Sequence, residues 1–226
     1  MHDLFTVLQQ LTVSAIPVIF AITMHEAAHG YAALYFGDDT AKRAGRLSLN
    51  PLRHIDLFGT IILPAILLFV GGMMFGWAKP VPVNFSRLRG GRLAMVAVAA
   101  AGPASNVSMA VIAVLLSKLT PLIPEFFRGW YQLNLQSFLI INLLLAVFNM
   151  IPIPPLDGGR VAVGLLPLPL ASRLARIEPQ GMLILMGLLF LLPMIGRAMG
   201  RDTDVIGWII DGGINHLIRL ILGLVG

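Results

Sequence analysis

The sequence predicts an all-α membrane protein, a polytopic helical bundle of about five to six membrane segments. Hydrophobic residues make up 57% of the 226 positions, charged residues make up only 12%, and the mean hydropathy is +0.85. Soluble domains carry about 25% charged residues. The apolar residues also gather into long runs, and a helix needs about 20 such residues to cross a membrane.

The apolar runs lie at 5–36, 57–77, 93–119, 133–153, 182–195 and 205–225. The first four are long enough to span a membrane. The fifth is short, and the sixth is interrupted by Asp211, Asn215, His216 and Arg219. This last run is therefore expected either to span or to lie at the interface as an amphipathic helix.

The whole chain is predicted to form one membrane domain over residues 1–226, with a core at 5–165 and C-terminal helices at 180–226. No polar stretch is long enough for a separate soluble domain. The absence of cysteine excludes disulfides and thiolate metal sites. The net charge of +5 comes from short loops, which is typical of membrane proteins and does not indicate nucleic acid binding.

One motif carries chemistry: His25, Glu26 and His29 form the pattern H-E-x-x-H inside the first apolar run. Histidines four residues apart lie on the same face of a helix, where they can bind one Zn²⁺, and the Glu between them can act as a base. Ionisable groups at membrane depth cost roughly 2.5–3.5 kcal/mol each. We therefore interpret the motif as functional rather than as a polar cluster that holds helices together.

A catalytic zinc takes three protein ligands and leaves one position open. Five residues remain as candidates for the third ligand: His54, Asp56, Asp157, Glu178 and Asp211. Asp157 stands out because it follows three prolines, which stop the preceding helix, and precedes two glycines. Such a break at membrane depth is tolerated where it is buried in protein or lines a water-filled cavity. The alternative is an interfacial turn with a solvated carboxylate.

Three stretches carry a resemblance to a known family: HEAAH at 25–29, AGPASN at 101–106 and NMIPIPPLDGGR at 149–160. With them the sequence resembles the site-2 protease family of intramembrane zinc metalloproteases. LNPLRHIDLFGT at 49–60 and GWAKPVPVN at 76–84 are similar to its compact prokaryotic members, which lack PDZ and CBS domains. The resemblance implies that His25, His29 and Asp157 bind one zinc ion per chain. It also implies that Glu26 is the catalytic acid and base, and that Asn149 helps to hold the substrate or the oxyanion.

The function implied by the resemblance is hydrolysis of peptide bonds within or near transmembrane helices of substrate proteins in the lipid bilayer. A homo-oligomer is compatible with the sequence. A metal-ion transporter is one alternative, but the apolar runs carry few of the further acidic or His residues that a pathway needs. An inactive scaffold is another, against which the intact Glu26 argues. A serine protease is disfavoured because the sequence lacks a Gly-x-Ser-x-Gly nucleophile turn.

The metal site constrains the topology, because the two histidines and Asp157 lie towards the C-terminal ends of their segments. These ends are expected to face the same side, which favours a re-entrant 57–77; the alternative is that 57–77 spans and the two ends meet near mid-membrane. Pro64, Gly71 and Gly72 favour such a bend. A re-entrant path places 11 Lys and Arg residues on one side and 4 on the other, whereas a path with every run crossing gives 8 and 7. The positive-inside rule therefore predicts an active site towards the cytoplasm, and the plasma membrane is the expected location.

A short β-like edge is predicted within 57–92, where an unwound substrate could bind by strand addition. Its residues are Lys79, Pro80, Val81, Pro82, Val83 and Asn84. The alternative is a plain proline-rich turn. Two further residues are predicted to support the site. His54 is expected to position or cap the re-entrant segment, and Asn106 is expected either to pack between helices or to approach the metal.

Overall fold

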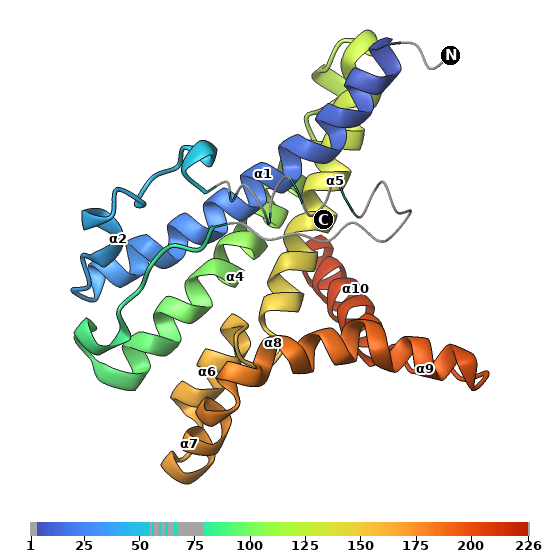
Figure 1. Cartoon of the computed structure of the whole chain (residues 1–226). Coiled ribbons are helices and arrows are strands. Elements are labelled where there is room, and N and C mark those ends of the chain that lie inside the picture. Colours follow the sequence, from blue (N-terminus) through green and yellow to red (C-terminus); the bar gives the residue numbers. More distant parts are fainter. Residues whose placement is uncertain are drawn as a thin grey trace.

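The computed structural model describes residues 4–54, 56, 59, 62, 66 and 79–225. These residues form helices and loops and contain no β-strand, so the predicted all-α class is confirmed. The centre of the molecule is a bundle of three long helices that pack against one another: α1 (Leu4–Tyr35), α4 (Gly91–Ser117) and α5 (Glu125–Asn149) (Figure 1).

Shorter elements connect and extend this bundle. The connections contain α2 (Thr40–Arg43) and the 3₁₀ turns η1 (Pro51–Arg53), η3 (Phe85–Arg87) and η4 (Thr120–Leu122). After α5 come α6 (Asp157–Leu165), α7 (Leu168–Arg176), α8 (Glu178–Met186), the π-helical η5 (Gly187–Leu191), α9 (Leu192–Ala198) and α10 (Val205–Val225).

Four helical stretches of the described chain are long and apolar enough to cross a membrane. They are Gly91–Ser117, Glu125–Asn149, Glu178–Ala198 and Val205–Val225. The predicted count of five to six segments is not confirmed by these four. The re-entrant path predicted for 57–77 falls outside the described residues, apart from three isolated positions. The predicted β-like edge at 79–84 is not assigned as a strand.

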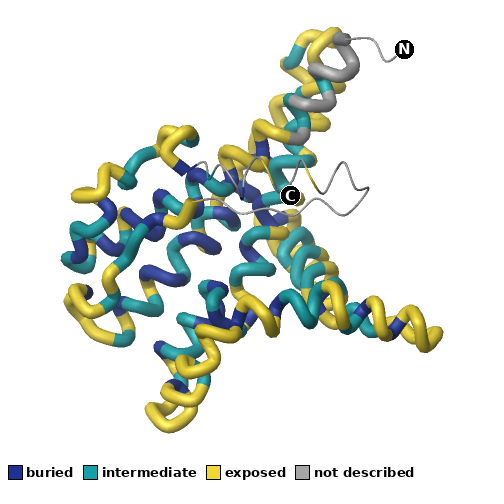
Figure 2. Tube along the Cα trace, in the orientation of Figure 1, coloured by how far each residue is buried: buried dark blue, intermediate teal, exposed yellow. Residues whose placement is uncertain are grey.

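Small residues allow the central helices to approach closely. Several buried positions of α1 and α4 are alanines, such as Ala21, Ala33, Ala94 and Ala110. Small side chains at helix contacts are typical of membrane bundles, where packing rather than water exclusion drives association. Figure 2 shows the buried residues gathered along α1 and α4, whereas α9 is mostly exposed.

The C-terminal end of α1 is closed by a glycine. Gly37 has a φ of 97°, and its N–H donates to the Leu34 carbonyl at 3.0 Å while the N–H of Asp38 donates to the Ala33 carbonyl at 2.9 Å. This pair of bonds is a Schellman motif, which needs a left-handed residue after the helix. The motif turns the chain sharply and buries Asp38 next to the end of α1.

Three loop regions gather at this end of the bundle. The N–H of Arg89 donates to the Phe36 carbonyl at 2.7 Å, and the N–H of Lys79 donates to the His54 carbonyl at 2.9 Å. The guanidinium of Arg92 donates to the Val163 carbonyl at 2.6 Å. One end of the bundle therefore holds the loop after α1, the segment before α4 and the end of α6. The topology prediction places the basic residues of these three regions on one side of the membrane.

Candidate active site

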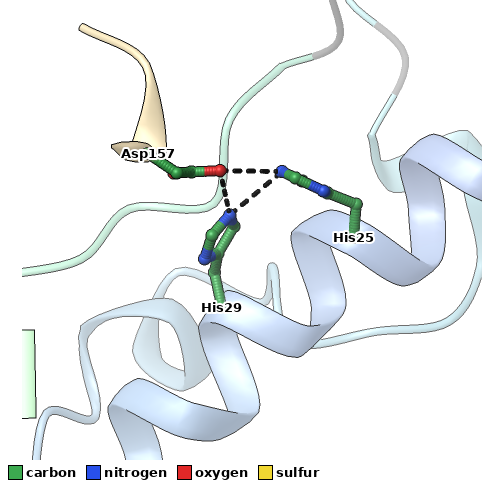
Figure 3. A group of neighbouring side chains, drawn as sticks. All are labelled: His25, His29 and Asp157. Atoms are coloured by element: carbon green, nitrogen blue, oxygen red, sulfur yellow. Dashed lines mark hydrogen bonds and ion pairs between the residues drawn. The ribbon is translucent and has the colours of Figure 1, made fainter. Parts of the chain in front are cut away.

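Three side chains from distant parts of the chain meet at one point (Figure 3). His25 and His29 come from α1, and Asp157 is the first residue of α6. Nε2 of His29 lies 3.1 Å from Nε2 of His25, and Oδ2 of Asp157 lies 3.2 Å from each nitrogen. In the part of the chain that the structure describes, no other group of three potential ligands converges in this way. Of the five candidates for the third ligand, the structure brings Asp157 to the histidines.

Hydrogen bonds at the outer ring nitrogens determine how the imidazoles point. Nδ1 of His29 lies 2.7 Å from the carbonyl oxygen of Val98. A carbonyl only accepts, so Nδ1 carries the hydrogen and Nε2 presents its lone pair to the centre. Nδ1 of His25 lies 2.6 Å from Oδ1 of Asn106 and donates in the same way. Metal-binding histidines typically donate their other N–H to such a partner.

Asn106 is in turn oriented by two other helices. Its Nδ2 donates to the Ala21 carbonyl of α1 at 3.2 Å and to Oδ1 of Asn142 in α5 at 2.8 Å. These bonds leave Oδ1 of Asn106 to accept from His25. Both asparagines are fully buried. Of the two roles predicted for Asn106, the structure places it against the site, and it adds Asn142, which the sequence interpretation missed.

The position of Asp157 follows from the chain break between α5 and α6. A Cβ added to Gly158 would lie 2.2 Å from the Met150 carbonyl oxygen, and one added to Gly159 would lie 2.4 Å from the nitrogen of Pro154. Only glycine lets the first turn of α6 pack this closely on the proline-containing turn. The Asp-Gly-Gly sequence therefore presses the start of α6 against the end of α5 and directs Asp157 to the histidines.

Gly102 of α4 makes room for the two imidazoles. A Cβ at this position would lie 2.3 Å from Nε2 of His29 and 2.7 Å from Cε1 of His25. These distances are far below van der Waals contact. The AGPASN stretch thus supplies both the space for the rings, through Gly102, and the acceptor for one of them, through Asn106.

Gly102→Ala is expected to lower the affinity for zinc by at least the roughly 10–100-fold that a disturbed metal site costs, because the added methyl displaces both rings. Gly-to-Ala changes inside helices normally stabilise by about 0.5–1 kcal/mol. The control is Gly129→Ala in α5, where a Cβ meets open space. Zinc per chain and thermal unfolding would be measured for both variants. Unchanged zinc in Gly102→Ala would contradict the geometry.

The three ligand atoms fit a zinc ion. Four-coordinate zinc with nitrogen and oxygen ligands at about 2.0–2.2 Å holds them roughly 3.3–3.6 Å apart, close to the 3.1–3.2 Å found here. Oδ2 of Asp157 is buried and accepts no hydrogen bond in the described chain. A buried carboxylate oxygen of this kind is costly unless a cation binds it.

Glu26 lies beside this group and contacts the segment before α4. Its Oε2 accepts a hydrogen bond of 2.6 Å from the N–H of Val81. Glu26, the three convergent residues, Val81 and Asn149 all line one cavity of about 280 Å³. The amide of Asn149 donates to the Leu145 carbonyl at 3.0 Å, which holds its side chain at the end of α5.

Segment 79–84 is held at both ends and in the middle. Its first N–H donates to the His54 carbonyl, Val81 donates to Glu26, and the N–H of Asn84 donates to Oδ2 of Asp38 at 2.6 Å. Burial raises the pKa of Asp38, but hydrogen bonds from Thr40 and Asn84 and the nearby Arg87 outweigh it and hold that pKa below its usual range. A charged Asp38 thus fixes the segment above the cavity.

Few backbone donors remain in this segment for a substrate strand. Pro80 and Pro82 have no N–H, and three of the other four N–H groups are already used within the protein. Strand addition therefore stays a prediction, and in this conformation it relies on the N–H of Val83 and on carbonyl groups. His54 is buried, and its Nε2 lies 2.8 Å from the Ser48 carbonyl. Its ring thus anchors the preceding loop.

Arg160 is a cavity residue that the sequence interpretation did not single out. Its guanidinium carbon lies 4.8 Å from the centre of the Phe85 ring, and Nη2 lies 3.4 Å from Oε1 of Glu178. Arg160 follows Asp157 by three residues, so both lie on the same face of α6. The three-residue spacing of Asp157 and Arg160 within NMIPIPPLDGGR could have indicated from the sequence that Arg160 lies near the site.

Comparisons with known proteins identify the family of the chain. The model of "Peptidase family M50" matches residues 126–194, a range that includes Asn149 and Asp157. A Bacillus subtilis (strain 168) protein named "Putative zinc metalloprotease YwhC" is 39% identical over 206 residues, covering 83% of this chain and 87% of that protein. The chain belongs to the site-2 protease family, peptidase family M50.

Two mycobacterial proteins named "Putative zinc metalloprotease Rip2" are also similar. The one from Mycolicibacterium smegmatis is 33% identical over 143 residues, 62% of this chain and 52% of that protein. The one from Mycobacterium tuberculosis H37Rv is 28% identical over 199 residues, 88% of this chain and 73% of that protein. No solved structure matches the chain. Membership of family M50 and the four apolar helices support a multi-pass membrane metalloprotease.

Proposed function

We propose that this chain is an intramembrane zinc endopeptidase that hydrolyses peptide bonds within or near transmembrane helices of other proteins. The observation that carries the proposal is the convergence of His25, His29 and Asp157 in a cavity that Glu26 also lines. Two neutral imidazoles and a carboxylate can together bind zinc. Glu26, the acid between the two histidines, is then free for proton transfer.

The depth of the site supports a substrate within the membrane. The partners of the two histidines on α4 are Val98 and Asn106, which lie 7 and 15 residues after its first residue, Gly91. At 1.5 Å per residue these positions are about 10 and 22 Å along the helix axis. Since α4 is long and apolar enough to span, the site lies below the end of the helix rather than in a surface loop.

The residues of the chain have separate roles in the proposed reaction. When bound, zinc supplies a Lewis acid that polarises the scissile carbonyl and acidifies water. Glu26 accepts the proton of the attacking water and later delivers it to the leaving amine. Asn149, on the cavity wall, is placed to hold the substrate or the oxyanion. Asn106 and Val98 keep the histidine lone pairs directed at the centre.

The substrate segment must be unwound, because helical hydrogen bonds shield each peptide group. A purified sample in liposomes with a model single-span substrate tests the proposal, with the products mapped by mass spectrometry. We expect a cut inside or next to the apolar segment. Cleavage confined to soluble loops, or none with zinc present, would contradict the proposal.

Val81→Pro is expected to lower the rate of cleavage about tenfold or more, because a hydrogen bond to a charged group contributes about 1.5–3 kcal/mol and this change removes the one that Glu26 accepts. The control is Val81→Ala, which keeps the N–H. kcat and KM would be measured for both variants with zinc quantified. A loss confined to KM, or an equal loss in both variants, would show that Val81 acts through its side chain or on substrate binding.

We further propose a plasma membrane location with the site towards the cytoplasm, from the 11 to 4 distribution of basic residues. Because the chain has no cysteine, single cysteines can report on each end. Ser86→Cys lies at the proposed cytoplasmic end and Ser117→Cys at the other. A membrane-impermeant maleimide added to intact cells should label only Ser117→Cys, and the reverse pattern would overturn the orientation.

A further inference from the structure

Helix α10 runs through the bundle from one end to the other. At its start, Ile206 packs with Ile151, just after α5. Further along, Gly213 approaches Val147, and Ile221 packs with Leu143 and Ala110. At its end, the carbonyl of Val225 accepts a hydrogen bond from Lys118, which follows α4. These contacts place α10 across the same thickness as the membrane-spanning helices α4 and α5.

The opposite face of α10 carries polar side chains that the described residues leave exposed, and at one end Asp211 also lines an open groove with Arg197 and Arg201. Asp211, Asn215, His216 and Arg219 all lie at exposed positions of this helix. Ionisable residues in membrane helices almost always face protein or a water-filled cavity, because lipid leaves them unsatisfied. A spanning helix with three ionisable side chains and one asparagine away from its packed face is therefore expected to have a protein partner.

The spacing of this face is that of a two-stranded helix pair. Gly212, Asn215, Arg219 and Leu222 follow one another at intervals of three, four and three residues, so they lie along one stripe of the helix that can form the seam with a second helix. Gly212 permits close approach, and Asn215 can hydrogen-bond across the seam. Arg219 lies six residues before the end of α10, about 9 Å, so its long side chain can extend to the interface.

Two side chains on this face, Asp211 and His216, complement a second copy of the same helix. Copies inserted in one orientation pair about an axis along the membrane normal, so their α10 helices run parallel. In a parallel pair with this seam, Asp211 and His216 occupy the two flanking positions that face each other between helices. Asp211 of each copy then lies opposite His216 of the other copy, which gives two equivalent acid–imidazole pairs.

We propose that the α10 face formed by Asp211, Gly212, Asn215, His216, Arg219 and Leu222 is the interface of a parallel homodimer. The proposal does not depend on peptidase activity, because the residues at the metal-binding group come from α1 and α6. It gives Asp211 and His216 partners in the second copy, while Arg219 of each copy extends towards the interface.

Cysteine cross-linking in native membranes tests the interface, since the chain has no cysteine of its own. Gly212→Cys and Asn215→Cys lie on the seam. The matched control is Leu220→Cys, which is also on α10 and exposed but points away from the seam. We expect disulfide-linked dimers from the two seam variants and monomers from the control. Equal cross-linking of all three, or none, would overturn the proposal.

A charge exchange tests the pairing itself. Asp211→His and His216→Asp each place like groups opposite one another. Each is expected to raise the dimer dissociation constant in liposomes about threefold for each acid–imidazole pair that is broken, or roughly eightfold for the two symmetric pairs. The double variant Asp211→His/His216→Asp re-forms both pairs and should restore dimerisation. Zinc content should be unchanged in all variants. If the double variant fails to dimerise, the parallel pairing is overturned. Cross-linking of this face to a different transmembrane protein would also overturn it.

Discussion

Glu26→Gln is expected to lower cleavage of a transmembrane substrate by about 10²–10⁴-fold, the usual contribution of a general acid–base residue, while zinc stays bound. The glutamine amide cannot take a proton from water at neutral pH. Its carbonyl oxygen can still accept the hydrogen bond from Val81, so the segment above the cavity should stay in place. The effect is therefore expected in kcat rather than in KM.

Glu125→Gln is the matched control for this variant, because Glu125 starts α5 and does not line the cavity with Glu26. It should cleave like the wild type. The decisive readouts are kcat for cleavage and zinc per chain in the same samples. Cleavage by Glu26→Gln at the wild-type rate would remove Glu26 from the mechanism, whatever the zinc content.

Asp157→Ala is expected to release zinc from the protein, with a loss of affinity larger than the roughly 10–100-fold that follows from removing a supporting hydrogen bond. The change leaves only His25 and His29 as ligands. In Asp157→Ala, cleavage should fall together with the zinc content. In Glu26→Gln, cleavage should fall while the zinc content stays unchanged. This contrast distinguishes a ligand from a base.

Asp202→Ala serves as the control for Asp157→Ala, since Asp202 is an exposed acid in the turn before α10. It should keep its zinc. Thermal unfolding of both variants shows whether either change disturbs the fold. A folded Asp157→Ala protein with zinc at the wild-type level would mean that the third ligand is another residue.

The sequence predicted the helical membrane class because composition and run length alone determine it. It also predicted that His25 and His29 share a helix face, since their spacing is local. The third ligand was harder, because five candidates remained on the residues alone and only packing brings one of them to α1. The resemblance pointed to Asp157, and the structure brings that residue to the histidines.

Other parts of the site depend on contacts between distant segments and had no local signal. The bond between Val81 and Glu26 joins residues 55 positions apart, and Asn142 meets Asn106 across two helices. The fifth apolar run was predicted to be short, but the helix extends over Glu178–Ala198 because α8, η5 and α9 are continuous. Residues outside the apolar core of a run can continue its helix, which hydropathy does not detect.

Removal and return of zinc is the most direct test of the central claim that His25, His29 and Asp157 form the metal centre of a peptidase. The purified protein would be assayed with a transmembrane substrate in liposomes, then stripped with a chelator, and then resupplied with zinc. We predict one zinc per chain at the start, loss of cleavage with loss of zinc, and recovery of both together. Full cleavage by the metal-free protein would contradict the account.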